Sequence, residues 1–415
     1  MCSQARNPLQ APHISAAMSH VGHFTIVTNN LVVFHAAALH IAAMQHKIEK
    51  QILVLQGGGA LGAYQAGAYE ALALAGLEPD WIAGISIGAI NAALIAGNAP
   101  ENRVKNLRAF WEKVSSGLQG PSYLPGDHGR SLFNETSSWL TTLFGIPGFF
   151  TPRFPPPTFA SPGTDAALSF YDTAPLRQTL GDLIDFNILN TNGKRVSVGA
   201  VNVKSGNFKF FDTANDRLSA DHIMASGALP PGFPPIVIDG QSYWDGGLVS
   251  NTPLQYVIDE ARGDRDLCIF QVDLFSSQGL VPKTILEAAE REKEIRFSSR
   301  TRLNTTAALE TQRLHKAARN LFDKLPAELR DDPDARILTE NGREAAITVL
   351  HLINRPTAPD SQSKDYEFSR LSVEEHWQAG RNDVEHSLSQ PAWRNRERPK
   401  HGMKTFDLTR KPRNE

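Results

Sequence analysis

Two glycine-bearing turns within residues 51–97 constrain the fold of this chain more than any other feature of its sequence. Each turn follows a short apolar run, residues 52–55 and residues 81–83, and each precedes an alanine-rich stretch of helical character. A short apolar run that ends in a turn is typical of a buried strand, and alternating strands and helices favour a parallel sheet. The segment therefore predicts the beginning of an α/β fold.

The second turn has the pattern G-x-S-x-G, with Ser86 between Gly84 and Gly88. In this pattern a sharp strand-to-helix turn lifts the serine hydroxyl clear of the sheet, and the glycines leave room where a Cβ would collide with neighbouring chain. The helix that follows directs its positive end at the serine. The pattern predicts a nucleophile. The alternative is a tight turn whose serine only caps the helix.

The first turn, Gly57–Gly62, presents backbone N–H groups without side-chain obstruction at the start of a helix. Such a nest binds an anion and could hold the oxyanion that forms when a serine attacks an ester. The same residues also match G-x-G-x-x-G, the fingerprint of dinucleotide binding, with Asp80 about 20 residues further on. Asp80 precedes the second strand rather than ending it, which favours the oxyanion interpretation.

A third turn lies far downstream, where Asp245 is followed by Gly246 and Gly247. Taken alone, this tripeptide is typical of a surface turn. The three turns in this order resemble the signature of the patatin-like phospholipase family, and the stretch Ala-Ser-Gly-Ala-Leu-Pro at 225–230 is similar to a further block of that family. The resemblance covers roughly residues 50–260.

The resemblance implies a three-layer α/β sandwich with a mostly parallel central sheet flanked by helices, and a serine acyl hydrolase that acts on lipid esters. It also implies a Ser–Asp dyad with Ser86 as nucleophile and Asp245 as base, without a catalytic histidine, a cofactor or a metal. The oxyanion hole would be formed by Gly57, Gly58 and Gly59. The supporting glycines would be Gly62, Gly84, Gly88, Gly246 and Gly247. The family usually has Arg or Lys at the position of Leu61, so any role of that cation is in doubt here.

Composition excludes several classes of protein. A net charge of −2 argues against nucleic acid as a partner. Two cysteines, Cys2 and Cys268, provide no disulfide framework. The sequence contains no uninterrupted run of 18 apolar residues, so no membrane span is expected. The lack of a recognisable signal favours a cytoplasmic location, with peripheral membrane contact open through a basic tail that begins at Arg394. The oligomeric state stays open.

The chain is expected to divide into three parts. Residues 1–49 form an N-terminal extension, partly disordered; residues 50–275 form the catalytic domain; and residues 276–415 form a mostly helical C-terminal region. Within the catalytic domain, residues 117–170 are rich in proline and phenylalanine. This insertion is either an irregular segment anchored by its aromatic side chains or a lid that faces lipid. The apolar run at 347–353 is expected to join the main sheet.

Other candidate residues fit less well. His222 and His351 would serve a Ser–His–Asp hydrolase, and Asp273 is a second candidate carboxylate. The spacing of His35, His40 and His46 matches no zinc motif. Two other functions stay open: a Rossmann-like nucleotide-binding protein that uses Gly57–Gly62, and a lipid-binding protein on the same fold that does no chemistry.

Overall fold

The computed structural model describes residues 49–115, 143–191, 193–261, 265–279, 281–340, 345–355, 367–400 and 402–409. The chain divides into two units, Met1–Lys47 and Ile48–Glu415. The first unit, which contains His35, His40 and His46, lies outside the described residues, as do residues 117–142 of the predicted insertion. All that follows concerns the second unit.

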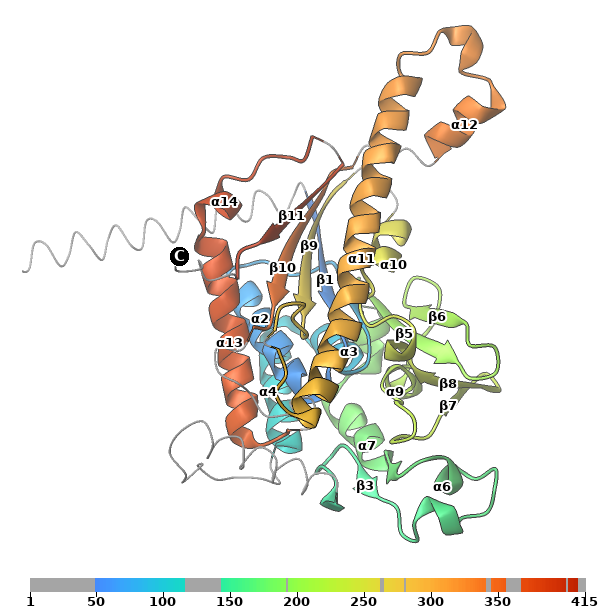
Figure 1. Cartoon of the computed structure of the whole chain (residues 1–415), viewed down its shortest axis with the longest axis vertical. Helices are drawn as coiled ribbons and strands as arrows, with labels where there is room; N and C mark the ends of the chain where they lie inside the picture. The colour runs from blue at the N-terminus through green and yellow to red at the C-terminus, as the bar shows by residue number, and fades with distance from the viewer. Residues whose placement is uncertain are drawn as a thin grey trace, which may run out of the picture. The chain divides into compact units, whose positions relative to one another are not determined.

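Within the described residues, a nine-stranded sheet forms the centre of this unit (Figure 1). Six neighbouring strands run parallel in the order β11–β10–β9–β1–β2–β5, and β6, β7 and β8 add antiparallel pairings. The strands are β1 Glu49–Leu55, β2 Trp81–Gly84, β5 Arg195–Asn202, β6 Phe208–Asp212, β7 Ile236–Ile238, β8 Gln241–Asp245, β9 Asp266–Asp273, β10 Ile347–Ile353 and β11 Met403–Asp407. A separate antiparallel pair is formed by β3 Thr151–Pro152 and β4 Tyr171–Asp172.

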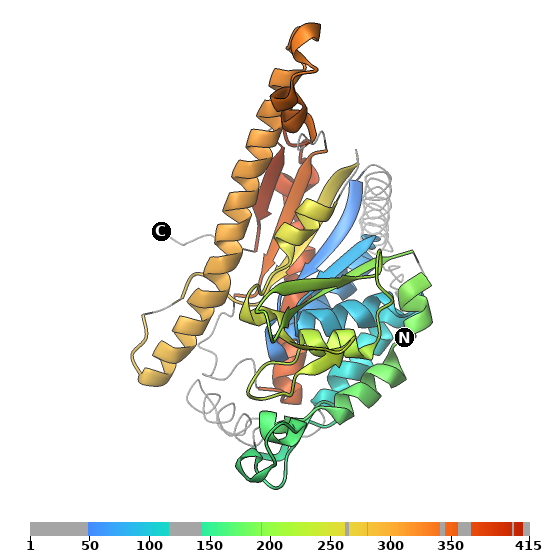
Figure 2. The same cartoon turned by 90° about the vertical axis from the view of Figure 1, so that its right-hand side faces the viewer.

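Helices cover both faces of the sheet (Figure 2). Successive side chains of a strand point to opposite faces. In β1, Leu53 and Leu55 accordingly join a core with α2, α3, α4 and α13, whereas Ile52 and Val54 join a core with α10 and α11. The predicted three-layer α/β sandwich with a mostly parallel sheet is confirmed. The helices are α2 Gly62–Leu74, α3 Ile87–Ala96, α4 Arg103–Val114, α6 Asp165–Leu168, α7 Ala174–Leu183, α8 Phe186–Thr191, α9 Ala220–Ser226, α10 Leu254–Glu260, α11 Ile285–Phe322, α12 Pro333–Glu340, α13 Arg370–Ser389 and α14 Pro391–Arg394.

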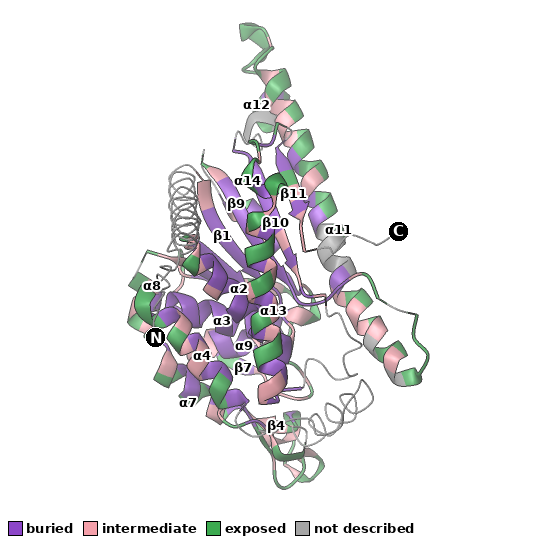
Figure 3. Cartoon of the chain, turned by 90° about the vertical axis from the view of Figure 1, so that its left-hand side faces the viewer, coloured by how far each residue is buried: buried purple, intermediate pink, exposed green. Residues whose placement is uncertain are grey.

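The C-terminal region completes the sheet as well as adding helices. β10 pairs with β9 in parallel, as the apolar run predicted, and β11 forms the next strand. α11 is a single helix of 38 residues whose first turn is capped by Thr284, which accepts a hydrogen bond from the Glu287 N–H. Figure 3 shows the central strands buried and much of α11 exposed. The residues that build the sheet therefore extend beyond the predicted catalytic domain.

The described part of the proline- and phenylalanine-rich insertion divides into an anchored half and an exposed half. Ile146, Phe149 and Phe150 are buried in the main core. Phe154 and Phe159, by contrast, are 95% and 79% exposed. Both interpretations of the insertion thus find support, each in a different set of aromatic side chains, while its action as a lid stays a prediction.

Two glycines allow α2 and α13 to approach closely. A Cβ at Gly67 would lie 1.8 Å from the Trp377 carbonyl oxygen, and a Cβ at Gly380 would lie 2.0 Å from the Tyr64 carbonyl oxygen. The Tyr64 hydroxyl donates a hydrogen bond of 2.7 Å to Asp383 across the same contact. Backbone atoms are the obstacle at both positions, so a methyl group could enter only if the helices separated.

We expect Gly380→Ala to lower the free energy of unfolding by about 1–3 kcal/mol, the usual cost of overpacking. Urea denaturation measures the effect. Gly181→Ala is the matched control, because Gly181 also lies in a helix but a Cβ there would meet nothing within 4 Å. That control should gain up to about 1 kcal/mol from helix propensity. Equal effects of the two substitutions would contradict the close-approach argument.

Candidate active site

The strands that precede Ser86 and carry Asp245 end facing each other beside β5. β6 runs along one side of β5, while β2 and β8 share the other side. β2 ends at Gly84, paired with Val198, and the antiparallel β8 ends at Asp245, paired with Ala200. The carboxyl ends of β2 and β8 therefore meet two residues apart along β5, and a glycine turn follows each.

Ser86 occupies the strained turn that its sequence pattern predicts. Its φ of 56° and ψ of −122° are unfavourable for a residue with a Cβ. A Cβ at Gly84 would lie 2.3 Å from the Gly88 carbonyl oxygen, and a Cβ at Gly88 would lie 2.5 Å from the Leu55 carbonyl oxygen, so the turn tolerates only glycine at both places. The Ser86 side chain makes no capping hydrogen bond to α3. Helix capping therefore does not account for this serine.

Asp245 carries a buried carboxyl group whose side chain interacts with Ser86. The residue is 3% exposed, and its Oδ1 accepts a hydrogen bond of 2.7 Å from the Gly247 N–H. Burial raises the pKa of Asp245 to about 6, and hydrogen bonds from the Gly247 N–H and the Ser86 hydroxyl offset only part of that rise. Among the described residues, no charged side chain contributes to this shift. Such a carboxylate is a stronger base than an exposed aspartate.

The glycine-rich turn after β1 passes beside Ser86. A Cβ at Gly57 would lie 3.1 Å from the Cβ of Ser86. The Gly57 N–H, one of the predicted oxyanion donors, already donates a hydrogen bond of 3.2 Å to the Asn251 carbonyl oxygen. The N–H groups of Gly58 and Gly59 donate no hydrogen bond within the part of the chain that the structure describes. Of the three predicted oxyanion donors, these two are therefore the ones left free.

The other glycines and Leu61 have packing roles around these turns. A Cβ at Gly62 would lie 2.5 Å from Ile87, and a Cβ at Gly246 would lie 2.5 Å from the Gly199 carbonyl oxygen. Leu61 is 2% exposed and belongs to the main apolar core. An apolar contact therefore occupies the position where the resemblance leads one to expect a cation.

Asp80 and His222 have structural partners elsewhere. The Asp80 carboxylate accepts a hydrogen bond of 2.9 Å from the Gln51 N–H at the amino end of β1, the opposite end from the glycine-rich turn. It therefore cannot act as the ribose-binding acid of a Rossmann site at that turn. His222 Nδ1 accepts a hydrogen bond of 3.0 Å from the Ser219 N–H at the start of α9, and burial lowers the pKa of this histidine.

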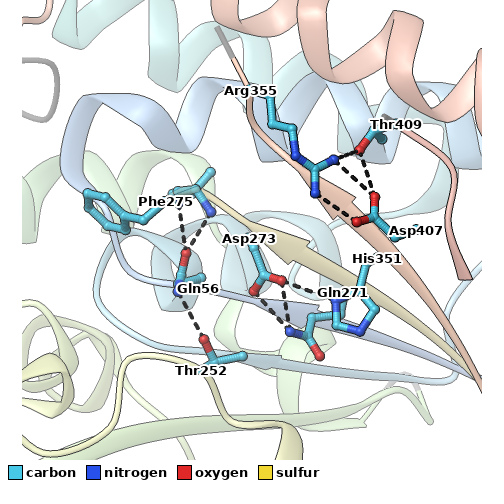
Figure 4. A network of polar contacts seen from close by, with 10 residues as sticks. Gln56, Thr252, Gln271, Asp273, Phe275, His351, Arg355, Asp407 and Thr409 are labelled. Atoms are coloured by element: carbon cyan, nitrogen blue, oxygen red, sulfur yellow. Dashed lines mark hydrogen bonds and ion pairs between the residues drawn. The ribbon is translucent and has the colours of Figure 1, made fainter. Parts of the chain in front are cut away.

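His351 and Asp273 form a cluster of their own on β9 and β10 (Figure 4). His351 Nδ1 lies 3.3 Å from Asp273 Oδ2, and the Gln271 amide donates to both oxygens of Asp273 at 3.0 and 2.9 Å. Among the described residues, no hydrogen bond or ion pair joins this cluster to Ser86 or Asp245. The structure therefore brings together Ser86, Asp245 and the glycine turns, but neither histidine.

Two residues of the site were missed as functional candidates in the sequence. Ser226 Oγ accepts a hydrogen bond of 3.0 Å from the Ser86 N–H and donates one of 2.7 Å to the Gly199 carbonyl oxygen, so it holds the Ser86 turn against β5. Asn251 bonds to the glycine-rich turn through both its backbone and its side chain. The block at 225–230 contained a signal for Ser226, whereas an asparagine six residues after Asp245 carries no recognisable signal by itself.

The described residues contain no group of three or more His, Cys, Asp or Glu side chains that could hold a metal ion. In the same part of the chain, every helix is too short or too polar to cross a bilayer. The Cys268 thiol is buried, and burial raises its pKa to about 12.

Two family models match the chain. One, described as Patatin-like phospholipase, matches residues 53–258, which contain all three glycine turns. The other, described as Patatin phospholipase, matches residues 295–400. Together the two matches cover most of the chain and include both the site and the C-terminal region.

The chain is similar to individual proteins only at low sequence identity. The chain is 27% identical over 224 residues to a cGAMP-activated phospholipase of Pseudomonas aeruginosa, over 51% of this chain and 56% of that protein. VipD from Legionella pneumophila is 14% identical with a TM-score of 0.37, over 82% of this chain and 66% of that one. Human GIVD cytosolic phospholipase A2 is 12% identical with a TM-score of 0.37, over 85% of this chain and 61% of that one.

We expect Asp245→Asn to stabilise the fold at pH 8. Because the folded-state pKa of about 6 exceeds the ordinary 3.8, this group stabilises the fold below pH 4, and that stability is lost as the pH rises through 6. The buried carboxylate then costs up to about 3 kcal/mol. Asparagine carries no charge and keeps an oxygen acceptor for Gly247.

Urea denaturation at pH 8 and pH 4.5 tests this expectation. The gain in the free energy of unfolding should be full at pH 8 and about three times smaller at pH 4.5, which lies between the two pKa values. Asp182→Asn is the control, since Asp182 is exposed on α7. A destabilised Asp245→Asn variant at pH 8, or a gain that is equal at both pH values, would show that burial of the charge is not the dominant effect.

Proposed function

Since this chain belongs to the patatin-like phospholipase family, we propose that it is a serine acyl hydrolase that cleaves fatty-acyl esters of lipids with Ser86 and Asp245. The observation that carries the proposal is the end-to-end meeting of β2 and β8. It brings a strained serine to a buried carboxylate, beside a turn with two free N–H groups. Nucleophile, base and oxyanion donors are the three parts that acyl transfer needs.

In the first half of the reaction, Ser86 Oγ attacks the carbonyl carbon of the lipid ester while its proton moves to the Asp245 carboxylate. The carbonyl oxygen becomes an oxyanion, which accepts hydrogen bonds from the Gly58 and Gly59 N–H groups. When the tetrahedral intermediate collapses, the bond from carbon to the alcohol oxygen breaks. The alcohol leaves with the proton from Asp245, and the acyl group remains on Ser86.

In the second half, water takes the place of the alcohol. Asp245 accepts a proton from water as the water oxygen attacks the acyl carbon, and the same N–H groups hold the second oxyanion. The ester bond to Ser86 Oγ then breaks, the proton on Asp245 returns to Ser86, and the fatty acid leaves. A base with a pKa of about 6 is ionised at neutral pH and can still carry a proton briefly, so this one side chain can serve both halves.

A fluorophosphonate probe tests the nucleophile and its base. We expect the wild-type protein to be labelled covalently, Ser86→Ala to take up no label, and Asp245→Asn to be labelled at least about 100-fold more slowly, the usual weight of a general base. Mass spectrometry of the labelled peptide identifies the modified residue. His222→Ala and His351→Ala should be labelled at the wild-type rate, because neither histidine contacts the dyad.

Other outcomes would favour other functions. A folded wild-type protein that takes up no probe but binds liposomes would indicate a lipid-binding protein that does no chemistry. Loss of labelling in His222→Ala or His351→Ala would replace the dyad with a triad. Thermal stabilisation by a dinucleotide, together with absence of labelling, would restore the nucleotide-binding interpretation of Gly57–Gly62.

We also propose that the exposed half of the insertion contacts a lipid surface. The loop between α9 and β7, residues 227–235, contacts both the insertion and the Ser86 turn. The Phe170 N–H donates a hydrogen bond of 3.1 Å to the Pro231 carbonyl oxygen in this loop, and a Cβ at Gly227, where the loop begins, would lie 4.0 Å from the Cα of Ser86. Exposed apolar side chains near a site mark a lipid or ligand surface. Those of the insertion and the loop are Leu143, Phe144, Phe154, Phe159, Leu168, Phe170 and Leu229.

The basic tail offers less support for membrane contact. Arg396 forms an ion pair of 2.9 Å with Glu49, and Arg398 forms one of 2.7 Å with Asp266. These cations are already paired within the fold, and residues 410–415 lie outside the described residues. Contact through the aromatic side chains would depend little on salt, whereas contact through the tail would weaken as salt rises.

We expect the double variant Phe154→Ser with Phe159→Ser to release fatty acid from phosphatidylcholine vesicles at least about tenfold more slowly, because each phenylalanine contributes about 1.5–3 kcal/mol when fully buried in an apolar phase and about 1.4 kcal/mol corresponds to tenfold. Hydrolysis of a soluble short-chain ester should change less than twofold. Leu74→Ser, which is 64% exposed at the far end of α2, is the matched control. An equal loss on vesicles and on the soluble ester would contradict contact with lipid.

A further inference from the structure

Asn251 joins the glycine-rich turn to the Asp245 turn. The residue is 5% exposed. The Asn251 side-chain Nδ2 donates a hydrogen bond of 2.9 Å to the Gly57 carbonyl oxygen, and the Asn251 backbone carbonyl oxygen accepts one of 3.2 Å from the Gly57 N–H. One residue thus satisfies both backbone groups of Gly57.

The Asn251 carboxamide also fills the space between the two turns. Its Oδ1 lies 2.4 Å from the place where a Cβ of Gly57 would be, and 3.0 Å from the place where a Cβ of Gly247 would be. Asp245 Oδ1 lies 3.1 Å from that same Gly247 position. The Asn251 amide is therefore a close neighbour of the carboxylate without bonding to it. Glycine at both positions is what admits the amide.

A second set of hydrogen bonds joins the same two segments through Gln56, and Figure 4 shows this set. The Gln56 amide donates a hydrogen bond of 3.1 Å to Thr252 Oγ1, and Gln56 Oε1 accepts hydrogen bonds from the N–H groups of Leu274 at 2.6 Å and Phe275 at 3.2 Å. Residues 56 and 57 are therefore held to residues 251 and 252 by adjacent bonds. Buried networks of this kind restrict the backbone to one conformation.

We propose that Asn251 is a positioning residue that aims the Gly58 N–H at the oxyanion. The Gly57 carbonyl and the Gly58 N–H belong to one planar trans peptide and point in opposite directions. By holding the carbonyl oxygen, the Asn251 amide sets the plane of that peptide and with it the direction of the N–H. Because Asn251 follows the Asp245 turn on the same segment, the oxyanion donor and the base are held in register. The inference rests on the hydrolase function proposed above.

Asn251→Ala and Asn251→Asp test the inference, since both remove the amide donor and the second keeps the size of the side chain. An oxyanion donor stabilises the transition state more than the bound substrate, so its misdirection should lower kcat and leave KM nearly unchanged. We expect kcat on a soluble short-chain ester, per site titrated with the fluorophosphonate, to fall about 10–100-fold in both variants, with KM within threefold of wild type. The rate of labelling should fall in parallel.

Asn98→Ala is the matched control. Asn98 is a buried residue whose amide also holds backbone carbonyl oxygens, those of Leu94 at 2.8 Å and Leu183 at 2.9 Å, but at the far end of α3. It should lower the melting temperature without changing kcat per titrated site. A kcat within threefold of wild type in both Asn251 variants, or an equal fall in Asn98→Ala, would overturn the positioning role alone. A folded wild type that takes up no probe would overturn the hydrolase function, and the positioning role with it.

Discussion

The proposed active site depends on a carboxyl group that is buried without a cation beside it. Among the described residues, Asp245 has only the Gly247 N–H and the Ser86 hydroxyl to replace the water it has lost. This poor solvation raises its pKa to about 6. A salt bridge to Asp245 would lower the pKa again and would hold the carboxylate away from the serine. In the proposed reaction, the lack of a charged partner is therefore what makes this aspartate useful as a base, at a cost in stability.

Close approach of backbone to backbone provides the geometry in which that carboxylate meets the serine. Gly84, Gly88 and Gly246 each lie where a Cβ would be 2.3–2.5 Å from a carbonyl oxygen of a neighbouring segment. These contacts bring the ends of β2 and β8 together beside β5, and Ser226 ties the turn to the same strand. A strained residue such as Ser86 persists only where its surroundings determine its conformation this strictly.

The turns of the proposed site are buried and hydrogen-bonded, whereas part of the insertion exposes apolar side chains. The turns are held by buried hydrogen bonds from Asn251 and Gln56, whereas Phe154 and Phe159 extend into solvent from a segment that Phe149 and Phe150 anchor in the core. The proposed action on aggregated lipid needs both properties. The donors must not move during the reaction, and the surface must exchange water for acyl chains at low cost.

The sequence alone predicted the α/β fold, the elbow at Ser86 and the assignment of 347–353 to the main sheet, because these follow from local rules: apolar runs, glycine spacing and strand length. It also pointed to Asp245, but only through resemblance, since an aspartate before two glycines is locally an ordinary turn. It could not show that Gly57 is already bonded, that Leu61 is part of the core, or that Asn251 bridges two turns. Those facts depend on contacts between segments nearly 200 residues apart, and they arise only when the strands pair. The pKa of Asp245 likewise belongs to the folded chain, because burial, which no short stretch of sequence specifies, is its cause.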